Sequence, residues 1–481
     1  MNIFFGAQSG FVKIFQQIDL NLRESGLVEN SAYFVSDSEY YLKHKAELPL
    51  VGDESVGYLY EWDYTSKFYG HVSNQAMDEM LERYKEFDLW AAVVCDRRLM
   101  YGKHAKLRQD YSCHFSDEDL YKIVLSTLYG IEQLIKNAKP EAIVTLTPSS
   151  YGDYLLYFAA LRNGIRYLQL KFTKVNNNVL LSESFGASTG ELHKVYAEYI
   201  NSENHPYKEM AVEYLEIAGS KPIQYEGALT GKDRGYLVQL KESVKAFGSV
   251  LKRSISKDRA ITANDNHVPP IHSVFLYSHL LHSRNKKRAL SRMRRRMLSY
   301  SDAEGQGYVF YPLHSEPEIA LSVNGVSYQN QIELIRRLAQ SLPFDYKLVV
   351  KEHPKSLGWR TDNYYSKLLE IPNLYFADMD TRPYYWIKKS AMVATISGFV
   401  GFEAAILQVP VLVFGNVMFD MLPESMALKA RDLSRLHETI AKLLRTYDYK
   451  HDAMVAYVSA AMSLSVPVNV YSVLLCKQDR V

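Results

Sequence analysis

The sequence predicts an α/β protein with two Rossmann-like domains that face each other across a cleft. Strand-like apolar segments alternate with helical segments in both halves of the chain, and this alternation is typical of parallel sheets. A chain of 481 residues is too long for a single hydrophobic core of ordinary size. This length suits two domains of roughly 200 residues each. We place an N-terminal domain at 1–300, with a polar, helical or irregular insertion at 190–300, and a C-terminal domain at 301–481.

The first half begins with a short apolar run at 2–5, which predicts the first strand, and residues 6–10 form its loop. Ser116 and Asp119 are spaced as in a capping box, and apolar residues at helical spacing continue from there until just before Pro140. Gly164 is a good C-cap. We therefore expect further strands at 90–95, 142–147 and 165–170, and helices at 117–139 and 154–163.

The second half predicts another α/β domain from about Gly307, with strands at 308–312, 346–351, 374–378, 391–397 and 409–414 and helices at 328–340 and 402–407. Residues 390–414 are apolar enough to resemble a membrane span. Glu403 lies in the middle of this run, where a charge is costly, and Gly398 and Gly401 interrupt it. The run is better divided into strand, turn, short helix and strand.

Composition and the absence of several known motifs exclude some classes of protein function. A hydrophobic content of 47% with 23% charged residues indicates a globular protein, and a net charge of +2 gives no argument for nucleic acid as a partner. Cys95, Cys113 and Cys476 form neither a disulfide framework nor a zinc spacing, so a reducing cytoplasm is expected. The chain has no Walker A, GxGxxG or HExxH motif, which argues against P-loop kinases and dinucleotide enzymes.

Two segments that follow predicted strands of the second domain could bind a phosphorylated ligand, because ligands of open α/β sheets bind beyond the carboxyl ends of strands. A histidine after a strand can donate to a phosphate or ribose oxygen, and a Ser-Gly turn before a helix offers free N–H groups to an anion. A buried glutamate in that helix could accept hydrogen bonds from ribose hydroxyls. Each of these residues could instead have a structural role: the histidine as an ordinary loop residue, the Ser-Gly pair as a tight turn, and the glutamate as a cap or a salt-bridge partner. These donor-side candidates are Lys351, His353, Pro354, Ser397, Gly398, Phe399 and Glu403.

The catalytic candidates lie after the first strand of the second domain. His314, Glu316 and Glu318 fall within five residues, at a position that should border the cleft between the domains. Group transfer to a hydroxyl needs a general base or a carboxylate nucleophile. Loop capping and cleft electrostatics are the alternative roles of these side chains.

Weaker candidates lie elsewhere in the chain. In the N-terminal domain the possible cleft residues are Gly6, Gln8, Ser9, Asp153 and Glu183. The basic run from Arg284 to Arg296 is either the solvated face of a helix or a contact with an anionic membrane surface or polyanionic acceptor. No convincing group of metal ligands is present.

Three segments resemble a known family when read together. FYPLHSEPEIAL, LVVKEHP and ATISGFVGFEAAILQVPVLVFG, within residues 307–416, resemble bacterial capsule and lipopolysaccharide glycosyltransferases of the GT-B fold, especially Kdo transferases. The resemblance implies that His353 and Pro354 contact the nucleotide of a CMP-linked donor and that Ser397 and Gly398 hold its phosphate. It also implies an acidic residue in the cleft that acts as base or nucleophile, for which the segment offers Glu316 or Glu318, and no metal cofactor.

The chain departs from the Kdo enzymes at one point, because His314 and Glu316 stand where those enzymes usually have glutamine and aspartate. The predicted function is transfer of a sugar from a nucleotide donor, with CMP-Kdo as the leading candidate, to a capsule or O-antigen glycan. The acceptor would be lipid-linked and reached from the cytoplasmic face of the inner membrane. Alternatives are a UDP-sugar-dependent transferase, a nucleotide-sugar 2-epimerase, and a non-catalytic subunit of polysaccharide assembly.

Overall fold

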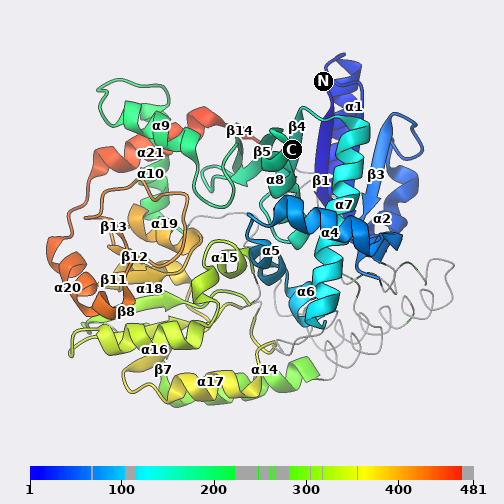
Figure 1. Ribbon diagram of the computed structural model, residues 1–481. Coiled ribbons are helices and arrows are strands. Elements are labelled where there is room, and N and C mark those ends of the chain that lie inside the picture. The colour runs from blue at the N-terminus through cyan, green and yellow to red at the C-terminus, as the bar shows by residue number, and fades with distance from the viewer. Residues whose placement is uncertain are drawn as a thin grey trace.

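The computed structural model describes residues 1–66, 69–102, 115–222, 281–303, 305–316, 318–354 and 356–468, together with residues 248, 261, 265 and 268. These residues form two seven-stranded sheets with helices packed around them, which confirms the predicted α/β class with two Rossmann-like sheets (Figure 1). Cys113, Cys476 and, apart from residues 248, 261, 265 and 268, the stretch 223–280 of the predicted insertion at 190–300 lie outside the described residues.

The first sheet contains five parallel strands, and two further strands join one edge through antiparallel pairings. Its order is β14 (Ser465–Pro467), β6 (Asn178–Ser182), β5 (Arg166–Phe172), β4 (Ala142–Leu146), β1 (Ile3–Gln8), β2 (Ser31–Ser36) and β3 (Val56–Tyr60). The predicted strands at 2–5, 142–147 and 165–170 are confirmed. Strand β14 comes from the end of the described chain, so this segment crosses back to the first sheet.

The second sheet is parallel throughout. Its order is β13 (Ala427–Lys429), β12 (Val411–Val413), β11 (Met392–Thr395), β8 (Tyr308–Pro312), β9 (Lys347–Lys351), β10 (Leu374–Ala377) and β7 (Met297–Leu298). All five strands predicted in the second half are present. Because β8 lies between β9 and β11, the loops after these three strands meet at one edge of the sheet.

Helices cover both sheets (Figure 1). Those packed around the first sheet are α1 (Phe11–Glu24), α2 (Ser38–His44), α3 (Glu61–Tyr64), α4 (Asn74–Tyr84), α5 (Leu89–Cys95), α6 (Arg97–Tyr101), α7 (Asp117–Ala138) and α8 (Tyr151–Asn163). Those around the second are α14 (His282–Met293), α15 (Ile319–Ser322), α16 (Gln331–Ser341), α17 (Asp362–Leu369), α18 (Pro383–Lys389), α19 (Phe399–Ile406), α20 (Leu436–Thr446) and α21 (His451–Leu464).

Successive residues of each strand are buried on opposite faces of its sheet, as the pleat of a strand requires. In β8, Tyr308 and Phe310 join one hydrophobic cluster, whereas Val309 and Tyr311 join another. Burial on both faces explains why these strands are continuous apolar runs in the sequence.

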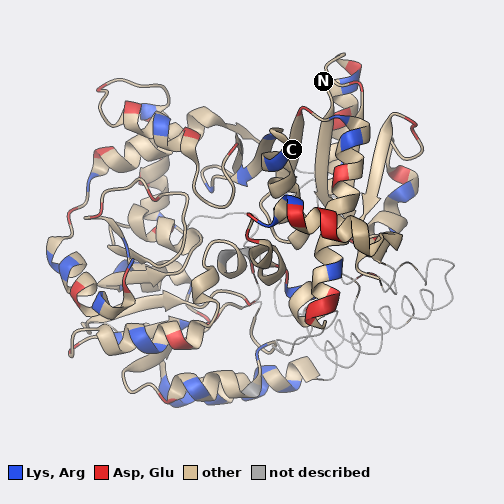
Figure 2. Cartoon of the chain, in the orientation of Figure 1, with Lys and Arg blue, Asp and Glu red and all other residues tan. Residues whose placement is uncertain are grey.

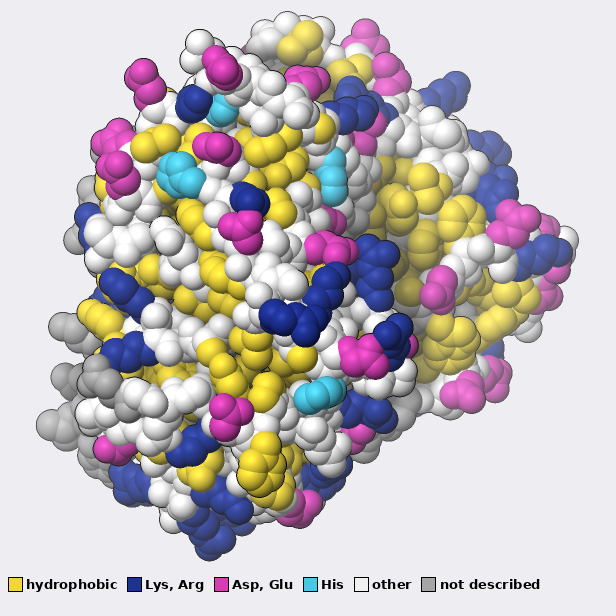
Figure 3. All heavy atoms as spheres, turned by 90° about the vertical axis from the view of Figure 1, so that its left-hand side faces the viewer, with side chains coloured by type: hydrophobic (Ala, Val, Ile, Leu, Met, Phe, Trp, Pro, Cys, Tyr) yellow, Lys and Arg dark blue, Asp and Glu magenta, His cyan; other side chains and the backbone are white. Residues whose placement is uncertain are grey.

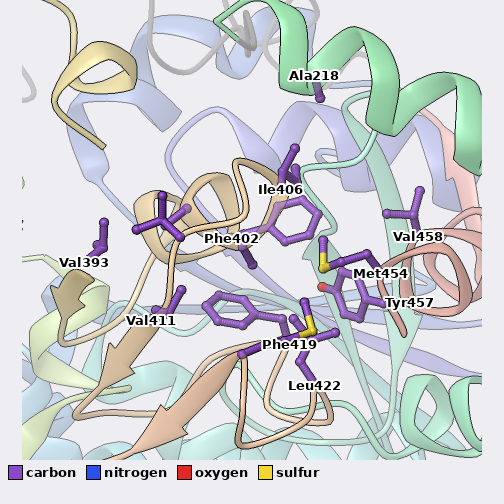
Figure 4. Packing of buried hydrophobic residues seen from close by; sticks show 14 of the residues in the cluster. Ala218, Val393, Phe402, Ile406, Val411, Phe419, Leu422, Met454, Tyr457 and Val458 are labelled. Atoms are coloured by element: carbon purple, nitrogen blue, oxygen red, sulfur yellow. The ribbon is translucent and has the colours of Figure 1, made fainter. Parts of the chain in front are cut away.

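Two helices that follow the first sheet pack on the second domain. α9 (Gly190–Tyr199) and α10 (Lys208–Ser220) contribute Leu192 and Ala218 to a cluster that also holds Phe402 of α19 and Tyr457 of α21. Figure 4 shows Ala218 on α10 above Phe402, Met454 and Tyr457. The helical part of the predicted insertion therefore helps to bury the outer face of α19, while the domain boundary at residue 300 stays a prediction.

The predicted strand at 90–95 is wrong, because these residues form helix α5. The Asp88 side chain accepts a hydrogen bond from the Ala91 N–H at 3.0 Å and caps this helix. A six-residue apolar run fits a buried strand and a buried helix equally well, and here the cap decides between them.

The division of residues 390–414 into strand, turn, helix and strand is confirmed by β11, α19 and β12. Among the described helices, none combines the length and the apolar character needed to cross a membrane.

Candidate functional site

The candidate site is built from the loops that follow β8, β9 and β11. His314 follows β8 and Ser397 follows β11, and the two are in contact although 83 residues separate them in sequence. The loop after β9 joins them through Ser356, whose hydroxyl donates to that of Ser315 at 2.8 Å. The sequence prediction that the His353 and Ser397 segments follow strands of one sheet is confirmed.

His314 lies beneath the turn that begins α19. Its Nε2 donates to the carbonyl oxygen of Ser397 at 2.5 Å, and its backbone N–H donates to Gln331 Oε1 at 2.9 Å. Burial lowers the pKa of His314, so the ring is held in its neutral form. Nδ1 is then an acceptor, and the described residues give it no hydrogen-bond partner. His314 therefore supports the Ser397 turn from inside.

Glu316 belongs to a buried ion-pair network centred on Arg360. The Arg360 guanidinium lies 3.1 Å from Glu316 Oε1 and 2.8 Å from Glu352 Oε2. The carboxylate of Glu316 also accepts hydrogen bonds from Gln331 and from Tyr364, the latter at 3.3 Å. With 8% exposure, Glu316 is positioned to hold the β8 loop rather than to face a substrate.

Glu352 completes this network from the β9 loop. It accepts hydrogen bonds from the Tyr365 hydroxyl at 2.8 Å and from the backbone N–H of His353 at 2.7 Å. Burial alone would lower the pKa of Arg360, but the carboxylates of Glu352 and Glu316 outweigh burial and raise the pKa. One cation thus joins the loops after β8 and β9.

The turn from β11 into α19 has the geometry of an anion site. Gly398 is exposed, has φ of 103°, and is the residue before the first helical turn. A Cβ placed on Gly398 would meet no atom within 4 Å, so open space lies next to the backbone. The hydroxyl of Ser397 donates to the carbonyl of Asn416 at 3.0 Å, which ties the turn to the end of β12. Free N–H groups at the start of an α-helix attract anions such as phosphate.

Replacing Gly398 by alanine should weaken nucleotide binding and cost about 1–3 kcal/mol of stability, because only glycine adopts this φ without strain. Calorimetric titration with nucleotides and urea unfolding would measure the two effects. Gly164→Ala is the matched control, since Gly164 also has a positive φ and open space around its Cβ position, but caps α8. Equal nucleotide affinity in the two variants would contradict an anion site at Gly398.

Glu403 lies in the middle of α19 and is 8% exposed. No side chain among the described residues makes a hydrogen bond or ion pair with its carboxylate, and burial raises the pKa of Glu403 to about 7. A buried acceptor of this kind suits the ribose hydroxyls proposed from the sequence, because a hydroxyl donor would satisfy it.

Glu403→Gln should raise the melting temperature at pH 8 and change it little at pH 5. The folded protein binds the Glu403 proton more tightly than the unfolded chain, so the charged carboxylate destabilises the fold as pH rises through about 7. Glutamine removes this cost. Glu216→Gln, at an exposed position of α10, is the control. A stability gain that does not depend on pH would contradict this assignment.

The remaining donor-side candidates surround the β9 and β11 loops. The Lys351 ammonium donates to the carbonyl oxygen of Asp378 at the end of β10, and burial lowers the pKa of Lys351 to about 8. Lys351 thus joins two strand ends. His353 is half-buried, Pro354 is exposed, and Phe399 is half-buried at the start of α19.

Glu318 lies at the junction between the domains. It is exposed, and its backbone carbonyl accepts hydrogen bonds from the N–H groups of Leu321 and Ser322 at the end of α15. Helix α15 contacts α5 of the first domain (Figure 1). The Glu318 carboxylate acts electrostatically on Arg97 and Lys174, which both belong to the first domain. The structure thus separates Glu318 from the buried Glu316.

The N-terminal candidates divide into two groups. Gln8 donates to Asp153 and to the Ser150 hydroxyl, and Asp153 caps α8 by accepting the Ser150 N–H at 3.0 Å. Burial raises the pKa of Asp153 to about 7. Gly6 lies inside β1 rather than in the expected loop, and a Cβ there would lie 2.8 Å from Leu156.

Ser9 is exposed with a positive φ of 45°, directly after β1. Glu183 forms a surface ion pair with Arg166 at 2.6 Å. Because β6 runs antiparallel to β5, the end of β6 lies beside the beginning of β5. Glu183 is therefore placed away from the carboxyl edge of the first sheet, and the structure does not bring it together with Gln8 and Asp153.

Sequence reasoning missed the two residues that join the site loops, Arg360 and Asn416. Arg360 lies in a polar loop without a motif, and Asn416 acts through its backbone carbonyl. The only available signal was the buried position of Glu352 after a strand, since a buried carboxylate requires a partner.

In the part of the chain that the structure describes, no cluster of three or more His, Cys, Asp or Glu side chains could hold a metal ion. Metal independence stays a prediction.

Taken together, fold and site define a protein of two Rossmann-like sheets with a helix-start anion site at the carboxyl edge of the second. Residues 270–444, which contain this entire edge, match the family model described as "Capsule polysaccharide biosynthesis protein". The match covers less than half of the chain. It confirms the resemblance of this segment to proteins of capsule synthesis. No curated protein matches the sequence.

Several solved structures are similar at low identity. KpsC of Thermosulfurimonas dismutans, a beta Kdo 2,7 transferase, is 11% identical, with 76% of this chain and 91% of that chain covered and a TM-score of 0.33. The UDP-GlcNAc 2-epimerase of Neisseria meningitidis is 10% identical over 96% of this chain and 98% of that chain, with a TM-score of 0.30.

Proposed function

We propose that this chain is a glycosyltransferase that moves a sugar from a nucleotide donor to a bacterial capsule glycan. The observation that supports it best is the Ser397–Gly398 turn, with open space beside Gly398, inside the segment that matches the capsule polysaccharide family model. CMP-Kdo is the leading donor, and an O-antigen acceptor is the alternative to capsule.

The residues that would carry the chemistry all belong to the second domain. The N–H groups at the start of α19 would hold the donor phosphate and stabilise the charge that develops as it leaves. Glu403 would accept from the ribose, and His353 would contact the nucleotide. Glu318, at the junction with the first domain, would take the proton of the acceptor hydroxyl.

Thermal shift with CMP, UDP, GDP and dTDP tests the proposal, on the wild type, His353→Ala and the control His451→Ala at an exposed position of α21. A shift with CMP that is lost only in His353→Ala supports a CMP-sugar donor. A shift with UDP would indicate a UDP-sugar donor. Product analysis with the donor alone would then be needed, because an epimerase converts the donor without an acceptor. No shift with any nucleotide would contradict the enzyme and favour a non-catalytic assembly subunit.

We also propose that the enzyme works in the cytoplasm, at the inner membrane, through α14. The exposed basic side chains of α14 lie at 284, 287 and 288, three and four positions on from the first, so they share one face of the helix, and Arg294 and Arg295 follow it. Ala289 and Met293 of the same helix are buried. Figure 2 shows Lys and Arg concentrated along α14, and Figure 3 shows a dense group of them at the same lower end of the molecule. The exposed positions are Arg284, Lys287, Arg288, Arg294 and Arg295.

Vesicle sedimentation should show binding to vesicles with anionic lipid and not to neutral ones, and binding should weaken with salt. Replacing Arg284, Lys287, Arg294 and Arg295 by glutamine should reduce affinity about fivefold per charge removed. The matched control removes four exposed basic residues near α20, namely Arg435, Lys442, Arg445 and Lys450. Equal loss in both variants would indicate only a general charge effect and contradict docking through α14.

A further inference from the structure

Asn324, which lies just beyond α15, is placed between the two domains. Its Oδ1 is 3.5 Å from the position that a Cβ on Gly186 of the first domain would take. Val323, the residue before it, joins the hydrophobic cluster of the first domain, and Figure 1 shows α15 between the two sheets. On the other side, the Asn324 carbonyl accepts the N–H of Asn416 at 2.7 Å. Asn416 in turn accepts the Ser397 hydroxyl, so Asn324 supports the phosphate turn from behind.

The position of Asn324 is fixed by close packing of its backbone. A Cβ on Gly415 would lie 2.5 Å from the carbonyl oxygen of Asn324 and 2.8 Å from that of Ile396. The Gly415 N–H donates to the Ile396 carbonyl at 2.7 Å. Only a residue without a side chain fits between these two backbones. The Asn324 backbone is therefore held against the strand end that leads into the Ser397 turn, while its side chain reaches towards Gly186.

The loop of the first domain that faces Asn324 is held by two side chains of β5. The Gly186 N–H donates to Gln169 Oε1 at 3.2 Å, and the Gly186 carbonyl accepts from Gln169 Nε2 at 3.4 Å. The Lys171 ammonium donates to the Ser188 carbonyl at 2.6 Å. Gln169 and Lys171 are both buried, and the hydrogen bonds to the loop offset the cost of burying them. Among the described residues, a Cβ on Gly186 would meet Asn324 Oδ1 and no other atom within 4 Å, so space is open beside this rigid loop.

The Asn324 side chain is not satisfied by the protein itself. Asn324 is half-buried, and its Oδ1 is buried without a hydrogen-bond partner among the described residues. A buried acceptor without a partner is costly, so a ligand that supplies a donor would bind here favourably. A hydroxyl suits an amide well, because it can donate to the amide oxygen or accept from the amide nitrogen. The amide carries no charge, so it matches a hydroxyl better than an anionic group.

We propose that Asn324, together with the space beside Gly186, binds hydroxyl groups of the sugar that the donor carries. That sugar is bonded to the donor phosphate, and the turn proposed for the phosphate is joined to Asn324 through Asn416 alone. The sugar would then be held between the two domains. The inference rests on the proposed glycosyltransferase function and assigns to it the residue that recognises the transferred sugar.

The test is calorimetric titration of the full chain with free nucleotides and with nucleotide sugars. The probes are UDP with UDP-glucose and UDP-N-acetylglucosamine, and CMP with CMP-N-acetylneuraminate. Asn324→Ala should weaken the nucleotide sugar about tenfold and the free nucleotide by less than about twofold, because it removes hydrogen bonds to the sugar alone. Asn324→Ser keeps a hydroxyl and should lose less affinity. Asn201→Ala, at an exposed position after α9, is the control.

Equal weakening of nucleotide and nucleotide sugar in Asn324→Ala would overturn the sugar subsite, because Asn324 would then act only through the phosphate turn. Unchanged binding of nucleotide sugars in Asn324→Ala would overturn it as well, and so would a wild type that binds nucleotides but none of the nucleotide sugars. The nucleotide thermal shift separates these failures from that of the proposed function, since a wild type without any shift overturns the transferase itself. Melting curves of Asn324→Ala and Asn324→Ser confirm that the variants are folded.

Discussion

Replacing Arg360 by methionine should lower the free energy of unfolding by about 3–5 kcal/mol, because it leaves two buried carboxylates without their cation. The side chains of Arg360 and Glu352 are fully buried and that of Glu316 is nearly so. Urea unfolding, followed by fluorescence and circular dichroism, measures the loss. Arg337→Met is the control, since Arg337 pairs with Glu333 at the surface of α16 and should matter little.

A second variant separates loss of charge balance from loss of packing. Adding Glu352→Gln to Arg360→Met removes one of the two orphaned charges, so the double variant should be more stable than Arg360→Met alone. If the loss of stability in the double variant equals the sum of the losses in Arg360→Met and Glu352→Gln, the ion pair does not cause the loss. Because the network joins the loops after β8 and β9, Arg360→Met should also weaken nucleotide binding in the fraction that remains folded.

The strands of the second sheet could be predicted because each is a continuous apolar run that ends in polar residues. Burial on both faces produces this pattern, and it needs no knowledge of distant contacts. The run at 90–95 shows the limit of this approach. Its apolar pattern favoured a strand, although Asp88 supplies a local signal for a helix cap. The positions of His353 and Ser397 after two strands of one sheet followed from the same strand pattern.

The partners of site residues could not be predicted, because they depend on loops far apart in sequence. His314 meets Ser397, and Glu316 meets Arg360 across 44 positions, with no motif at Arg360. From the sequence alone, His314, Glu316 and Glu318 were therefore all catalytic candidates, and nothing distinguished them. The structure gives them three different surroundings: beneath a turn, inside an ion-pair network, and at the domain junction.

Because their surroundings differ, Glu316 and Glu318 should respond differently to the same substitution. Glu318→Gln should lower turnover by about 10²–10⁴-fold, the usual contribution of a general base, and change stability little, because its carboxylate is exposed. Glu316→Gln should lower stability, since it removes a charge from the Arg360 network, while turnover per folded molecule is largely retained. The assay uses the nucleotide sugar selected by thermal shift and a capsule glycan acceptor.

The contrast is decisive because glutamine keeps the shape of each side chain and removes only its charge and proton acceptor. If Glu318 is the base, the rate of wild type should fall as the carboxylate is protonated at low pH, and the residual rate of Glu318→Gln should lose this dependence. Retained turnover in Glu318→Gln together with lost turnover in folded Glu316→Gln would reverse the assignment. The buried glutamate would then have to become accessible, which requires the β8 loop to leave Arg360.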